Sequence, residues 1–167
     1  MINRRHLLAM IALGSAAVPI TAALKAYSWW NIPADAPFKH LSIDEATQVR
    51  RIAESVFPSG ETIALDGGSA KLDRFLDELI DQFGSQEVSL IKFMLHGIEP
   101  MPFPIYGTTF SSLSSTNRLL FLQSWLHHDN HLVRNAMMSI VTLLGMGYTC
   151  HPDVSPLIST HHKCGFG

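Results

Sequence analysis

Residues 42–56, SIDEATQVRRIAESV, indicate the fold class of this chain. The stretch begins with a capping box, because Ser42 is followed three residues later by Glu45, a pair that can satisfy the free N–H groups of a first helical turn. Apolar residues then recur at steps of three and four, the spacing of one helical face: Ile43, Ala46, Val49, Ile52, Ala53 and Val56. We therefore expect an amphipathic helix that ends at Phe57-Pro58-Ser59-Gly60.

Four later stretches show the same helical periodicity. The first follows Asp66-Gly67-Gly68-Ser69 and closes at Gly84, with an apolar face of Leu72, Phe75, Leu76, Leu79, Ile80 and Phe83 and an acidic face of Asp73, Asp77, Glu78 and Asp81. The next spans about 86–97, with Val88, Ile91, Met94, Leu95 and Ile98 inward. The last two run from the cap Ser114 to about His127 and from about Asn130 to Gly145, where Gly145, Gly147 and Pro152 are expected to stop the helix.

No segment alternates with a period of two over a useful length, which argues against strands. The sequence therefore predicts an all-α bundle of about five helices, with an irregular tail from Tyr148 onward. Its length of 167 residues suits one domain, and 47% apolar against 16% charged residues excludes disorder. A net charge of −2 argues against a nucleic-acid partner, which would require a basic surface.

The stretch 99–110 interrupts the helical pattern. Three prolines in five residues are expected to forbid a helix here, so the stretch reads as a loop. Proline lowers the entropy cost of holding neighbouring side chains in place, so an exposed loop would suit a protein partner. A buried loop would be a lid over the bundle, and both interpretations remain open. The candidate partner-binding residues are Met101, Phe103, Ile105 and Tyr106.

The N-terminus reads as an export signal over residues 1–26, followed by a linker at 27–40, a helical domain at 41–147 and a tail at 148–167. Arg4 and Arg5, with Leu7 and Leu8 after a one-residue gap, resemble the twin-arginine signal for folded proteins. A general secretory signal and an uncleaved membrane helix are the alternatives. Because no large cofactor site is visible, a folded export route suggests that another protein travels with this one.

Cys150 and Cys164 are the only cysteines, and in an exported protein they predict a disulfide that pins the tail. A bond to a partner chain, or a metal held together with His151, His161 and His162, are the alternatives. The cluster His127, His128 and His131 would share a helical face only in one continuous helix, and we expect no metal there. No nucleophile, P-loop or dinucleotide motif is present, and Asp66-Gly67-Gly68 reads as a turn rather than a phosphate cradle. No catalytic residue and no cofactor are thus expected in this chain.

Several motifs in order resemble the gluconate 2-dehydrogenase subunit 3 family. They are Arg4-Arg5; Leu41-Ser42 opening a helix that reaches Val56-Phe57-Pro58; Leu65-Asp66-Gly67-Gly68 before Leu72-Asp73-Arg74-Phe75; Arg118-x-x-Phe121-Leu122-x-x-Trp125; and Gly147-Tyr148-x-x-His151-Pro152-x-Val154. The resemblance implies a non-catalytic small subunit. It would pair with a large FAD-binding subunit of the glucose-methanol-choline (GMC) oxidoreductase type, and often with a multihaem cytochrome c. The pair would enter the periplasm through the twin-arginine (Tat) translocase.

Two other functions follow from the residues alone. One is a free-standing periplasmic helical protein that binds a metal or small ligand through the His/Cys tail. The other is a membrane-tethered scaffold that keeps its N-terminal segment.

Overall fold

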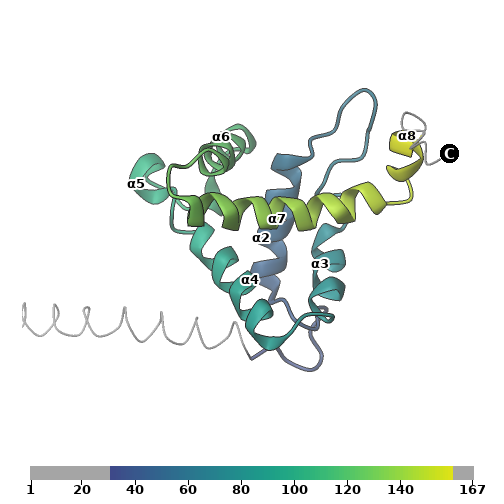
Figure 1. Cartoon of the computed structure of the whole chain (residues 1–167), viewed down its shortest axis with the longest axis horizontal. Helices are drawn as coiled ribbons and strands as arrows, with labels where there is room; N and C mark the ends of the chain where they lie inside the picture. The colour runs from purple at the N-terminus through teal and green to yellow at the C-terminus, as the bar shows by residue number, and fades with distance from the viewer. Residues whose placement is uncertain (1–30, 160–167) are drawn as a thin grey trace, which may run out of the picture. The chain divides into compact units, whose positions relative to one another are not determined.

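The computed structural model describes residues 31–159 (Figure 1). The described residues fall into two units that divide after Ala36, residues 31–36 and residues 37–159. In the first unit the described part is residues 31–36, where the Ala36 N–H donates to the Pro33 carbonyl at 3.0 Å. The second unit is helical and contains no strand among its described residues, which confirms the all-α prediction.

Short connections join most of the helices of the second unit, and the longest connection, residues 57–71, follows the first helix. In chain order the helices are α2 (Ile43–Val56), α3 (Leu72–Ile80), α4 (Ser85–Ile98), α5 (Phe103–Tyr106), a 3₁₀ turn η1 (Phe110–Ser112), α6 (Ser115–Leu126), α7 (His131–Cys150) and α8 (Ser155–Ser159). Helix α2 packs against α3, α4 and α6, while α7 packs against α6 and α3 and so bridges them (Figure 1). Among residues 31–159, no helix combines the length and apolar character that crossing a membrane requires.

The predicted capping box of α2 is confirmed. The Ser42 hydroxyl accepts a hydrogen bond from the Glu45 N–H at 3.2 Å, and the Glu45 carboxylate accepts one from the Ser42 N–H at 2.7 Å. The expectation that Ile43 faces the core is wrong, since its side chain is 64% exposed. Glu45 is fully buried in its place, and the rest of the predicted face packs inward.

Helix α3 ends earlier than expected and buries part of its acidic face. It stops at Ile80, and Gly84 is the N-cap of α4 rather than the end of α3. Asp73 and Asp77 are 1% and 8% exposed, against the expectation of an acidic outer face. Asp77 can be buried because it accepts three backbone N–H groups, from Lys39, His40 and Leu41, each at 2.8 Å. This bonding fixes the start of the domain onto α3.

The predicted end of the last long helix is wrong, because α7 continues past both glycines to Cys150. Gly147 is a packing residue: a Cβ there would lie 2.4 Å from the Phe75 ring, so glycine allows α7 to approach α3. Tyr148 is buried beyond it and stacks on Phe57 with ring centroids 4.5 Å apart. Its hydroxyl donates to the Leu65 carbonyl at 2.5 Å. The irregular tail expected from 148 therefore begins as helix and is followed by α8.

Candidate functional site

The proline-rich stretch between α4 and η1 contains a short helix, so the expectation that it excludes helix is wrong. Helix α5 has Pro102 as its N-cap and Pro104 in its first turn. Proline is tolerated there because first-turn N–H groups have no intrahelical acceptor. Gly107 closes the turn with a φ of 68°, and its N–H donates to the Phe103 carbonyl at 2.9 Å. The prolines thus begin a helical turn.

The two ends of this loop are tied together by Glu99. Its carbonyl accepts the Phe110 N–H at 2.9 Å, and its carboxylate accepts the Ser111 hydroxyl at 2.8 Å and the Ser111 N–H at 3.2 Å. Phe110 is fully buried beneath the loop, and Pro102 is buried within it. A segment closed at its base and stiffened by prolines holds its outer side chains in place.

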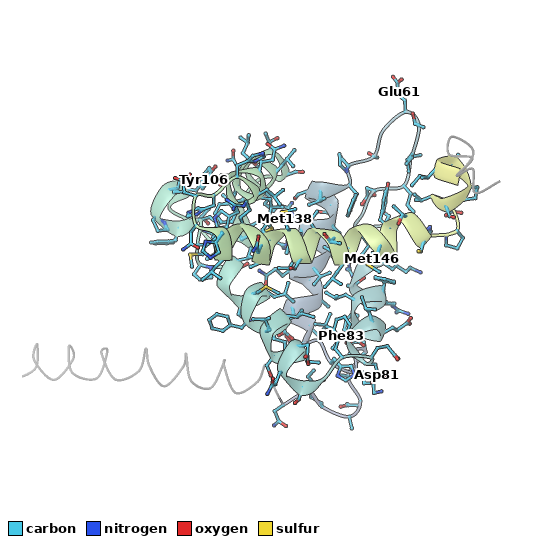
Figure 2. All side chains as sticks on the ribbon, in the orientation of Figure 1. Glu61, Asp81, Phe83, Tyr106, Met138 and Met146 are labelled. Atoms are coloured by element: carbon cyan, nitrogen blue, oxygen red, sulfur yellow. The ribbon has the colours of Figure 1, made fainter. Side chains whose placement is uncertain are left out.

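The loop presents three of the four candidate residues to solvent. Met101, Phe103 and Ile105 are 50%, 61% and 73% exposed. Tyr106, labelled in Figure 2, is partly buried against the hydrophobic core. The lid interpretation therefore describes Tyr106, while the other three are available to a partner.

Exposed apolar side chains continue along α4, which leads into this loop. Leu90 and Phe93 are 58% and 72% exposed and lie three residues apart, so they share one side of the helix. We define the apolar face as Leu90, Phe93, Met101, Phe103 and Ile105. Isolated exposed apolar residues are ordinary, but a run of five along α4 and its continuation marks a candidate interaction surface.

The charged residues are unevenly distributed along the chain. Residues 31–84 contain fifteen Asp, Glu, Lys and Arg residues, whereas residues 85–159 contain seven, and residues 100–117 and 135–150 contain none. We call residues 85–159 the charge-poor segment. Exposed methionines at Met138 and Met146 lie along α7 within it (Figure 2). Depletion of charge with enrichment of Met and aromatic side chains is typical of the buried centre of protein interfaces.

A groove of about 500 Å³ opens on the outer side of α7. Its apolar lining comes from Phe83, Met138 and Leu143, and its polar lining from the uncharged Asn135, Ser139 and Thr142. Phe83 and Met138 are labelled in Figure 2. Such a groove can take up an apolar side chain and satisfy one polar group beside it.

A buried charge cluster joins α2 to α4, and sequence analysis missed it. The Glu45 carboxylate lies 2.9 Å from Lys92 Nζ and 2.8 Å from His96 Nε2, and its side chain is fully buried. Burial raises the pKa of Glu45, but the hydrogen bonds from His96, the Ser42 N–H and Lys92 outweigh it and hold that pKa below the ordinary value. The available signal was Lys92 and His96 at a spacing of four on the side of α4 that carries Leu95. The cluster lies within the fold and holds two helices together.

The remaining predicted site residues are placed as follows. Cys150 is exposed at the end of α7, while Cys164 lies outside the described residues, as do Arg4, Arg5, Leu7 and Leu8. His127, His128 and His131 are exposed at the break between α6 and α7, so one continuous helix does not carry them. In the described part of the chain no three His, Cys, Asp or Glu residues gather as metal ligands would.

Comparison with protein-family models, curated proteins and solved structures finds no match to this chain. The family resemblance therefore stays a prediction from the motifs. Within the fold, the α6 motif is a packing element. Phe121 is buried and its ring centroid lies 5.1 Å from that of Trp125, while Arg118 Nη1 donates to the Arg51 carbonyl of α2 at 3.2 Å.

Proposed function

We propose that this chain is the non-catalytic small subunit of a periplasmic, membrane-associated FAD-dependent dehydrogenase of the GMC type, which oxidises a sugar or an alcohol. Its role is to assist maturation and twin-arginine export of the large flavoprotein subunit. The observation that carries the proposal is the apolar face on a stiffened loop within a charge-poor segment. FAD belongs to the large subunit, and a multihaem cytochrome c is a further partner.

The physical argument begins with the cost of exposing the apolar face. Burying a side chain such as Phe103 or Ile105 fully is worth about 1.5–3 kcal/mol. A partner that covers this face gains that free energy with little loss of loop entropy, because Glu99 and the prolines already hold the loop. The surrounding stretch 100–117 has no charge to desolvate. The face therefore suits an apolar surface of another protein.

The export role rests on the N-terminal motif. A flavoprotein must receive its cofactor where FAD is present and then cross the membrane folded. A small subunit with a twin-arginine signal and a stable helical domain can carry such a companion. This step depends on Arg4 and Arg5 acting as an address, whereas docking depends on the apolar face. The two roles are separable by mutation.

Docking is tested with a matched pair of isoleucine variants. Ile105 on the apolar face and Ile43 at the start of α2 are 73% and 64% exposed. The tagged chain should co-purify from its native host with a large subunit in equal amounts, with bound flavin visible in the absorbance spectrum. Ile105→Asp should weaken the complex by about 2 kcal/mol, roughly thirtyfold in Kd, and Ile43→Asp should leave it intact. Equal retention of the flavoprotein by both variants would refute docking through this face.

Export is tested by replacing Arg4 and Arg5 with Lys. The large subunit should then remain in the cytoplasm with its flavin bound. If the large subunit still reaches the periplasm, the proposed export role is refuted. The proposed docking role is tested separately, by the Ile105→Asp and Ile43→Asp variants.

A further inference from the structure

A second surface feature lies in the charged part of the chain, away from the residues used above. It is a pocket of about 650 Å³ bounded by α2, the loop Pro58–Lys71, the first turn of α3 and Ser115 of α6. We call it the α2–α3 pocket. Its size falls within the range of small-molecule sites, roughly 300–1,000 Å³. Nine of its eleven lining residues are polar or charged, among them three basic and three acidic side chains.

The acidic side chains of the pocket are already engaged. Asp66 accepts the Ser69 hydroxyl at 2.7 Å and the Gly68 N–H at 2.8 Å, and the Ser69 hydroxyl leads the contacts that lower its pKa. Asp73 is 1% exposed, and its Oδ2 accepts Arg50 Nη2 at 2.5 Å, whereas its buried Oδ1 has no hydrogen-bond partner among the described residues. Glu54 lies 3.2 Å from Arg118 Nη1. The carboxylates therefore order the pocket wall.

The basic side chains are less fully engaged. Arg50 gives one nitrogen to Asp73 and leaves other N–H donors available. Lys71 and Arg74 are exposed, and neither side chain forms an ion pair with another of the residues 31–159. Within the described chain, the pocket therefore contains two cations outside ion pairs, Lys71 and Arg74, and one such carboxylate, Asp66, which leaves an excess of one positive charge.

The backbone at Lys71 adds an independent observation. Lys71 has a φ of 53° and a ψ of 40°, and it is the one non-glycine residue with positive φ among the described residues. This left-handed conformation costs free energy for any residue with a Cβ, and glycine would relieve it. Residues held in such conformations cluster at ligand-binding sites. The strained backbone at Lys71 therefore marks the rim of this pocket as a candidate ligand site.

We propose that the α2–α3 pocket binds a small organic oxyanion, with its carboxylate or phosphate held by Lys71 and Arg74 and supported by Arg50. The Ser59 hydroxyl can donate a further hydrogen bond to the ligand, whereas the Ser69 hydroxyl, which donates to Asp66, can only accept one from the body of the ligand. This site is distinct from the apolar face and does not depend on the proposed function.

The experiment titrates the full chain by calorimetry with inorganic phosphate and, separately, with citrate, against sodium chloride at equal ionic strength. Saturable binding of phosphate alone, or of citrate alone, identifies the anionic group, and either supports the proposal. Lys71→Gln with Arg74→Gln should weaken that binding by about twenty-five-fold, or about fivefold for each cation. The control is Arg134→Gln on α7, whose Nη1 donates to the His128 carbonyl and which should bind as the wild type does.

Two results would overturn the proposal. One is absence of saturable binding of either anion, and the other is an equal loss in the Arg134→Gln control. Lys71→Gly provides a second variant that fits the left-handed backbone at this position and is therefore expected to fold. It should melt at a higher temperature because the backbone strain is relieved, and yet bind the anion more weakly. Unchanged affinity in this variant would show that Lys71 has no role in binding.

Discussion

Replacing Lys92 with alanine should destabilise the domain more than any other lysine substitution in the described chain. Lys92 contacts the Glu45 carboxylate at 2.9 Å, and their side chains are 4% and 0% exposed. Removing the ammonium group leaves a buried carboxylate without its main cationic partner. Breaking a buried ion pair in this way costs about 3–5 kcal/mol.

The structure places this substitution near the lower end of that range. Glu45 keeps the Ser42 N–H at 2.7 Å and His96 Nε2 at 2.8 Å after Lys92 is removed. We therefore expect a loss of about 3 kcal/mol, a large part of the stability of an ordinary domain. With a typical urea dependence of about 2 kcal/mol per M, the unfolding midpoint should fall by about 1.5 M.

The assay is urea unfolding followed by the helical circular dichroism signal, because the described fold is all helical. The control is Lys39→Ala, which removes an ion pair with Asp81. The Lys39 and Asp81 side chains are 68% and 42% exposed, so this variant should change the urea midpoint little. A double variant, Glu45→Gln with Lys92→Met, should recover much of the lost stability. The reasoning is refuted if the Lys92 and Lys39 variants unfold at the same urea concentration.

Three further predictions concern acid stability, helix packing and the start of the domain. The folded state lowers the pKa of Glu45 from 4.5 and therefore binds fewer protons than the unfolded state, so the free energy of unfolding should fall as the pH drops below about 4.5. Unfolding measured at several pH values should show a less steep fall for Glu45→Gln than for the wild type. Gly147→Ala should cost about 1–3 kcal/mol of stability, because the added methyl group clashes with Phe75. Gly97→Ala, where a Cβ meets open space, should stabilise α4 by about 0.5–1 kcal/mol. Thermal melts of both variants check this, and equal melting temperatures would contradict it. Asp77→Ala should cost about 1–3 kcal/mol and speed hydrogen exchange at the amide of Leu41, and unchanged exchange there would count against the clamp.

The sequence predicted the helices wherever local signals agreed with packing. Ser42 and Ser114 both cap helices as expected, because a serine N-cap acts through neighbouring N–H groups and needs no distant partner. The prediction failed at Gly147, where the glycine is needed for contact with Phe75 of α3, 72 residues earlier in the chain. Local propensity cannot indicate such a contact, because it depends on tertiary packing.

The candidate site was predictable only in part. The proline spacing drew attention to Met101, Phe103, Ile105 and Tyr106, but it could not decide which of them face solvent. The hydrogen bond from the Ser111 hydroxyl to the Glu99 carboxylate depends on the path of the loop that brings Ser111 back to the end of α4, and no periodic pattern in the sequence predicts that path. Buried charges are a similar case, since Lys92 reads as a surface residue until its partner on another helix is known.

The uneven distribution of charge has a consequence for how the cell must handle this protein. Without the partner that we propose, Phe93, Phe103 and Ile105 remain in water, with few nearby charges to repel other copies. Surplus chains are then prone to self-association and to recognition by chaperones and proteases. Under the proposed function, the two subunits would have to be made in matched amounts, and over-production of this chain alone should yield aggregates whose formation the proposed partner prevents.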